Sequence, residues 1–136
     1  MGNPVESTPP EASLRLSVLE ERLAVCRLDP PAEIPAWATG VPFFSATRTS
    51  DELSIVCPEE HVPPGITCER GWRALRFDGP FEFGLVGVLA SVAVPLAESG
   101  VSILAIATYD TDYVLVEESQ LDLATQALRG RGHEVR

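Results

Sequence analysis

The chain has 136 residues, 45% of them hydrophobic and 22% charged, a composition typical of a globular protein with one ordinary domain or two small ones. Acidic residues outnumber basic ones 20 to 10, and the resulting net charge of -10 argues against nucleic acids and anionic membrane surfaces as partners. All ten basic residues are arginines, which excludes chemistry that needs lysine, such as a Schiff base or a Walker-type phosphate site.

The first residues hold prolines and glutamates without any hydrophobic period, so we expect a flexible tail over residues 1–12. This segment lacks the basic and apolar regions of a signal peptide. The longest uncharged stretch, residues 83–97, is shorter than the roughly 20 residues that a membrane span needs. These features predict a soluble, cytoplasmic protein with no membrane partner.

Residues 13–71 predict a first, abbreviated α+β unit. Short apolar or alternating runs favour four strands, at residues 14–18, 23–28, 43–49 and 53–57. Between the second and third strands a helix of at most two turns is expected, with Pro35 in its first turn and Gly40 at its end. A proline-rich connection over residues 58–65 closes the unit.

Residues 72–136 predict a complete unit with the order β-α-β-β-α-β. Its expected strands are residues 72–77, 101–108, 113–116 and 133–136. The first helix begins near Leu85 and ends at a glycine cap, Gly100, with a kink or an early end at Pro95. The second helix follows Ser119. Because residues 101–108 are almost wholly apolar, we expect them to form a central strand covered by helices. This order is the ferredoxin-like one, an antiparallel sheet with two helices on one face.

Three strings in the second unit carry a family resemblance: SVAVPLAE at 91–98, GVSIL at 100–104 and ATYDTDYVLV at 107–116. Together they resemble the ACT domain, in particular small bacterial tandem-ACT proteins and the related CASTOR-type cytosolic arginine sensors. The resemblance covers residues 14–136 and is strongest from residue 72 onward. It implies two ferredoxin-like ACT units per chain, and a homodimer that binds an amino acid where ACT units meet.

The resemblance also implies a set of ligand-binding residues: Glu82, Phe83, Gly84, Leu85, Val86, Ser102, Ile103, Thr108 and Asp112. Backbone N–H groups at the start of the first helix suit a ligand carboxylate, and a glycine there permits close approach. Glu82 and Asp112 align with acidic positions that pair with a cationic ligand. Ser102 and Ile103 match a strand edge whose backbone holds the ligand. The alternatives are that Gly84 serves helix packing, and that Asp110 and Asp112 are ordinary turn residues.

Other candidate groups favour structural roles. Cys26, Cys57 and Cys68 have wide spacings without a CxxC pattern, so we expect buried thiols and neither a metal site nor a disulfide framework. Neither His61 nor His133 lies in a catalytic or metal-binding motif. The arginines Arg70, Arg73 and Arg76 favour a solvated or salt-bridged face over an anion-binding patch.

The sequence therefore predicts a non-catalytic regulatory protein that binds an amino acid, with arginine as the first candidate, at an ACT–ACT interface of a homodimer. No metal or other cofactor is expected. The alternative is an assembly module whose ACT interfaces bind an unidentified protein partner and no small molecule.

Overall fold

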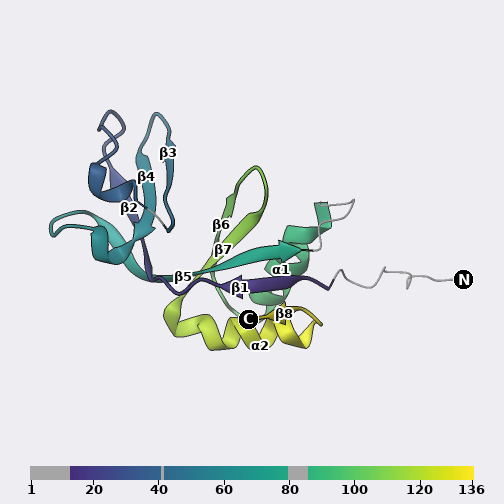
Figure 1. Cartoon of the computed structure of the whole chain (residues 1–136). Coiled ribbons are helices and arrows are strands. Elements are labelled where there is room, and N and C mark those ends of the chain that lie inside the picture. The colour runs from purple at the N-terminus through teal and green to yellow at the C-terminus, as the bar shows by residue number, and fades with distance from the viewer. Residues whose placement is uncertain (1–12, 41, 80–85) are drawn as a thin grey trace, which may run out of the picture. The chain divides into compact units, whose positions relative to one another are not determined.

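A computed structural model of the chain describes residues 13–40, 42–79 and 86–136, so the predicted tail over residues 1–12 lies outside it. The described chain divides into two compact units (Figure 1). The first unit is Glu20–Ala74, and the second combines the residues up to Leu19 with Leu75–Arg136. The chain passes from the first unit to the second within strand β5, Cys68–Gly79.

The second unit is a five-stranded sheet with two helices. Its strands beside β5 are β1 (Arg15–Val18), β6 (Ile103–Ala107), β7 (Asp112–Glu117) and β8 (Glu134–Val135), in the order β6-β7-β5-β1-β8. Its helices are α1 (Val86–Glu98) and α2 (Leu121–Gly130). The elements from β5 to β8 follow the predicted order β-α-β-β-α-β, and the predicted α+β class is confirmed.

Strand β1 belongs to the second unit, although the sequence suggested that it opens the first. It pairs antiparallel with β5 and parallel with β8, and so separates those two strands. Leu14 and Leu16 are fully buried in the core of the second unit. Alternation in residues 14–18 predicts a strand but says nothing of which sheet it joins, because pairing partners lie about 60 and 120 positions away.

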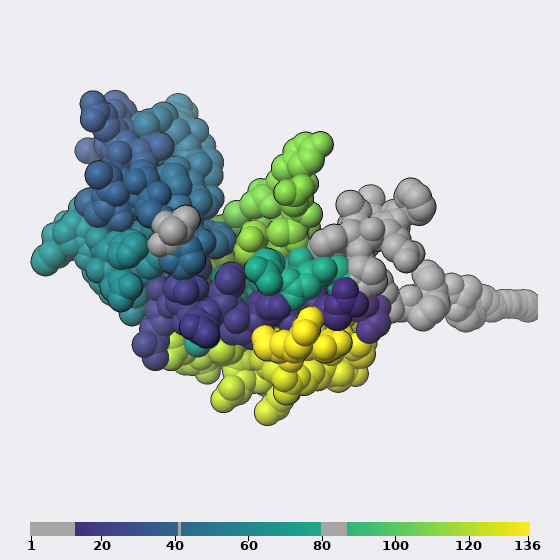
Figure 2. Space-filling view, in the orientation of Figure 1, coloured from purple at the N-terminus to yellow at the C-terminus, as the bar shows by residue number. Residues whose placement is uncertain are grey.

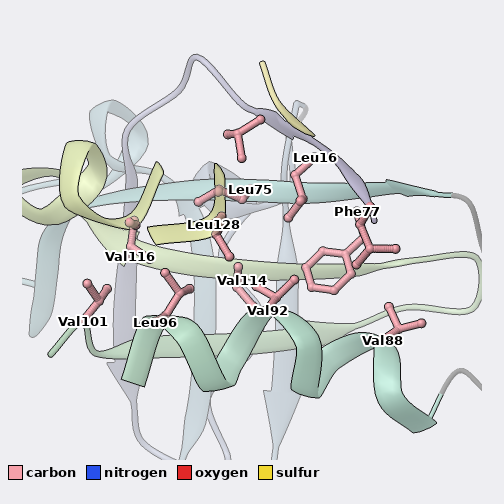
Figure 3. Packing of buried hydrophobic residues seen from close by; sticks show 13 residues of the cluster. Leu16, Leu75, Phe77, Val88, Val92, Leu96, Val101, Val114, Val116 and Leu128 are labelled. Carbon is pink, nitrogen blue, oxygen red and sulfur yellow. The ribbon is translucent and has the colours of Figure 1, made fainter. Parts of the chain in front are cut away.

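The core of the second unit lies between one face of the sheet and both helices. Alternate strand residues point toward it, and Figure 3 shows them facing Val88, Val92 and Leu96 of α1. The buried members are Leu14, Leu16, Leu75, Phe77, Val88, Val92, Leu96, Val101, Val114, Val116, Ala124, Leu128 and Val135. Since α1 and α2 share this core, the predicted placement of both helices on one face is correct.

The apolar segment 101–108 is not a central strand. It forms β6, which among the described residues pairs with β7 alone and lies at the edge of the sheet. Ile103 packs against the core, but Leu104, Ala105 and Ala107 are exposed. The prediction was wrong because an apolar composition indicates burial, whereas the apolar residues of this edge strand are exposed.

Helix α1 continues through Pro95 to Glu98, so the expected early end is not observed. Proline lacks the N–H that would bond the carbonyl of Ser91 four residues earlier. That carbonyl instead lies 3.0 Å from Nε2 of the buried His133. The predicted cap at Gly100 is present, with φ +81° and a 2.9 Å hydrogen bond from the Val101 N–H to the carbonyl of Leu96.

The first unit is a four-stranded antiparallel sheet with 3₁₀ turns. Strands β2 (Leu23–Leu28), β3 (Ser45–Arg48) and β4 (Leu53–Pro58) join the first half of β5 in the order β3-β4-β2-β5. Its helical segments are η1 (Ala36–Ala38) and η2 (Glu59–His61), and the described part of the unit contains no α-helix. A separate small core includes Ala24, Cys26, Leu53, Ile55 and Cys57.

The α-helices of the described chain have 13 and 10 residues. Neither approaches the length and apolar character that crossing a bilayer requires.

Candidate functional site

The β6–β7 hairpin holds Thr108 and Asp112 on either side of a tight turn. The Thr108 N–H donates to the carbonyl of Thr111 at 2.8 Å, and the Thr108 hydroxyl donates to the same oxygen at 2.7 Å. The Thr111 hydroxyl donates to the carbonyl of Phe77 at 2.5 Å, which fastens the turn to β5. Asp112 begins β7 opposite Ala107. The two predicted ligand-binding residues are therefore brought together on a locally fixed backbone.

The tip of this hairpin is open to solvent. Tyr109 is fully exposed and Asp110 is exposed, whereas the Asp112 side chain is half-buried. Figure 2 shows the green hairpin standing out from the rest of the second unit. The Asp112 carboxylate therefore lies at the start of a strand whose backbone the hydrogen bonds of the turn hold in place.

Ser102 and Ile103 lie at the opposite end of β6. The register pairs Ile103 with Val116, whereas Ala107 pairs with Asp112. Six residues of extended chain separate Ser102 from Thr108, which corresponds to about 20 Å. A single amino acid cannot bridge that distance, so one copy of the second unit does not bring all the predicted residues together.

The remaining predicted site residues are not described. Glu82, Phe83, Gly84 and Leu85 lie outside the described residues. Val86 is the first residue of α1, and its side chain is also outside them.

A polar cluster on the sheet face opposite the helices centres on Asp78, a residue that the sequence did not single out. Arg76 Nε donates to Asp78 Oδ1 at 2.7 Å, and the Ser17 hydroxyl donates to Asp78 Oδ2. Burial by itself would raise the pKa of Asp78, but the Ser17 hydrogen bond and the Arg76 ion pair outweigh it, so the pKa is lowered. The signal in the sequence is the i, i+2 spacing of Arg76 and Asp78, which places both on one face of β5.

This cluster makes stability depend on acid pH. Because the folded-state pKa of Asp78 is lowered, its contribution is present above the ordinary value of about 3.9 and is lost as pH falls through the folded value. We expect Asp78→Asn to lower the free energy of unfolding by about 1.5–3 kcal/mol at pH 7, and to weaken its pH dependence below pH 4. Urea titrations across this pH range test both effects. Asp110→Asn is the control, and an equal loss in that exposed turn residue would refute the assignment.

Two other candidate groups have structural partners, as expected. Arg70 donates to the carbonyls of Glu59 and Val62 at 2.8 and 3.3 Å, and Arg76 pairs with Asp78, so both guanidinium groups interact within the fold. The ring of the buried His133 forms hydrogen bonds with the backbone N–H of Leu14 and the carbonyl of Ser91. Within residues 13–40, 42–79 and 86–136 no group of three or more His, Cys, Asp or Glu side chains is arranged to hold a metal ion.

Comparison with known proteins decides the family. A family model described as the ACT domain matches residues 67–130, and a model of an N-terminal domain matches residues 21–65. A crystal structure of a protein from Agobacterium tumefaciens is similar over 92% of this chain and 93% of its own, with 37% identity and a TM-score of 0.88. This chain is an ACT-domain protein. The match to the ACT domain extends from the end of the first unit to the last residue of α2.

The ACT-domain protein is also similar to CASTOR-type sensors. The bovine cytosolic arginine sensor for mTORC1 subunit 1 is 33% identical over an alignment of 97 positions, which covers 63% of this chain and 30% of that relative. The chain thus spans less than a third of the arginine-sensor subunit. An aspartate kinase from Clostridium acetobutylicum has the same fold over 88% of this chain and 35% of its own, with a TM-score of 0.66 and 14% identity.

Proposed function

We propose that this ACT-domain protein is a non-catalytic regulatory protein of the cytoplasm that forms a homodimer and binds an amino acid between the ACT units of two copies. Arginine is the first candidate, since the similar subunits are named arginine sensors. The observation that carries the proposal is the open edge of β6, which has predicted ligand-binding residues at both of its ends.

The edge is suited to pairing with itself. Ile103–Ala107 contains no charged residue, so two copies meet there without like charges opposing one another, despite the net charge of -10. Antiparallel pairing about a two-fold axis at Ala105 sets Ile103 opposite Ala107 of the second copy. The same register sets Ser102 opposite Thr108. Residues about 20 Å apart in one copy thus become neighbours across the dimer, at two equivalent sites.

The ligand chemistry follows from the groups at those sites. The backbone edge beside Ser102 and Ile103 supplies N–H and C=O groups, as in strand addition. Asp112 of the other copy supplies a carboxylate for an ammonium or guanidinium group, and a guanidinium can form two parallel hydrogen bonds with it. A bound cation that is removed from water requires such a partner.

Ligand binding is tested by thermal unfolding with each of the twenty amino acids at millimolar concentration. We expect arginine to raise the Tm, and a ligand at 100 times its Kd adds about 2.7 kcal/mol to the free energy of unfolding. Asp112→Asn should abolish the shift, whereas Asp110→Asn, in the exposed turn, should retain it. A dimer that shows no shift with any amino acid would contradict sensing and favour the assembly module.

The interface is tested by sedimentation. Ala105→Glu places a carboxylate opposite its own copy on the proposed two-fold axis, so it should shift the protein toward monomer. Ala97→Glu adds the same charge at an exposed position of α1 and should leave the dimer intact. Equal behaviour of the two variants would reject β6 as the interface.

A further inference from the structure

Three free thiols gather in the core of the first unit. Cys26 lies on the central strand β2, Cys57 on β4 and Cys68 at the start of β5. Cys26 and Cys57 are buried, and Cys68 is half-buried and packs against the same core. The three residues are far apart in the sequence, and the sheet brings their side chains to one face.

Cys26 and Cys68 are direct cross-strand partners. The next pair along the ladder is hydrogen-bonded, since the Arg27 N–H donates to the carbonyl of Thr67 at 2.9 Å. In an antiparallel ladder, hydrogen-bonded and non-hydrogen-bonded pairs alternate, so Cys26 and Cys68 form a non-hydrogen-bonded pair. The Cα atoms of such a pair are about 4.5 Å apart, within the range of about 4.4–6.8 Å that a disulfide requires.

Cys57 does not meet this requirement. On β4 it faces Ala24, whereas Cys26 faces Ile55, so Cys57 is a diagonal neighbour of Cys26. Diagonal neighbours have Cα atoms about 7–8 Å apart, beyond disulfide range unless the backbone moves. The Cys57 and Cys68 thiols both lie beside that of Cys26, and the backbone separation favours Cys26–Cys68 as the pair that can form a disulfide.

We propose that Cys26 and Cys68 are an oxidative modification site, at which a peroxide joins them in a reversible disulfide between β2 and β5. This inference does not depend on amino-acid binding or on dimer formation, since both thiols lie within one copy of the first unit.

The half-buried Cys68 is the sulfur that the peroxide reaches first. Its thiolate attacks one oxygen of the peroxide, the O–O bond breaks, and Cys68 becomes a sulfenic acid. The displaced hydroxide takes up the proton that the Cys68 thiol lost on forming the thiolate, and leaves as one water. The Cys26 sulfur then attacks the sulfenic sulfur and forms the S–S bond, while the displaced hydroxide takes the Cys26 proton and leaves as a second water. Two thiols are oxidised by two electrons in total, and one hydrogen peroxide is reduced to two waters.

The burial of Cys26 fits the second role. Burial, with a smaller contribution from the adjacent Cys57 and Cys68 thiols, raises the pKa of Cys26 to about 12. A thiol that stays protonated reacts slowly with peroxide, because the thiolate is the nucleophile. Cys26 lies directly opposite Cys68 on the neighbouring strand, where it can react with a sulfenic acid formed on Cys68.

The test is peptide mapping of the full chain after treatment with hydrogen peroxide, under non-reducing conditions. We expect a peptide cross-linked between Cys26 and Cys68 of the same chain. Treatment with dithiothreitol should remove this cross-link. Cys57→Ala should retain the cross-link, whereas Cys68→Ser should lose it. The oxidised protein should also melt at a higher temperature than the reduced protein, because the bond closes the chain between the two strands.

The wild-type map is decisive even if a variant fails to fold. A cross-link that includes Cys57, a disulfide between two copies, or Cys68 oxidised to sulfinic acid without any cross-link would each overturn the assignment. Loss of arginine binding in Asp112→Asn would have no bearing on this outcome, so the two proposals fail separately.

Discussion

Phe77→Ala is expected to lower the free energy of unfolding by about 3–5 kcal/mol, the usual cost of removing a fully buried aromatic ring. Phe77 is 1% exposed and is the largest of the fully buried side chains. Figure 3 shows its ring on β5 pointing toward α1, near Val92 and Val114. Neighbours that belong to several different elements cannot all move inward, so we expect a cavity to remain.

The control for this variant is Phe44→Ala. Phe44 is 37% exposed, so its side chain buries less apolar surface than that of Phe77. Phe44→Ala should therefore lower the free energy of unfolding much less than Phe77→Ala does. Urea unfolding at 25 °C measures both values, and the slope of the transition reports whether the unfolding remains two-state. Similar losses for the two variants would show that the core described around β5 does not carry the stability of the second unit.

Local patterns predicted the order of elements in the second unit well. The helical spacing that ends at Gly100, and the apolar runs on either side of the expected turn at residues 109–112, involve residues within a few positions of one another. Thr108 and Asp112, which the family resemblance implied as ligand-binding residues, lie together because the hairpin fixes them through its own hydrogen bonds. Whether they bind a ligand remains a proposal.

The sequence patterns did not predict how strands that are far apart in the chain pair with one another. An apolar run does not specify whether a strand is central or at an edge, so residues 101–108 were predicted to be covered and instead form the open edge β6. Likewise, nothing near Cys26 in the sequence shows that Cys68 lies opposite it, 42 positions later. Register across β2 and β5 depends on the whole sheet.

The polar cluster at Asp78 was not predicted for a second reason. In the sequence it is followed by Gly79 and Pro80, and such a string is typical of a strand ending in a turn. In the structure it is still part of β5, and its carboxylate accepts hydrogen bonds from Ser17 and Arg76. The role depends on β1 arriving from the start of the chain, a contact that a single-sequence pattern does not contain.

His133→Ala is expected to cost about 2–4 kcal/mol of unfolding free energy, because one buried and one partly buried backbone group lose their partners and each costs about 1–3 kcal/mol. His133 is 3% exposed. The Leu14 N–H, which can only donate, lies 3.1 Å from Nδ1, so Nδ1 accepts and the ring proton is on Nε2. Nε2 then donates to the carbonyl of Ser91 at 3.0 Å. His61→Ala, in a half-buried 3₁₀ turn, is the control and should cost well under half as much.

Pro95 in α1 explains why the His133 ring is needed as a hydrogen-bond donor to the backbone. A double-mutant cycle tests this explanation. Pro95 has no N–H for the carbonyl of Ser91, and His133 supplies the missing donor. Pro95→Ala restores a backbone donor four residues after Ser91, so in that background His133→Ala should cost about 1–2 kcal/mol less. A residual cost should remain, because Leu14 still lacks an acceptor. Strict additivity of the two substitutions in urea unfolding would mean that the histidine does not replace the bond that the proline removes, and that its cost arises from packing alone.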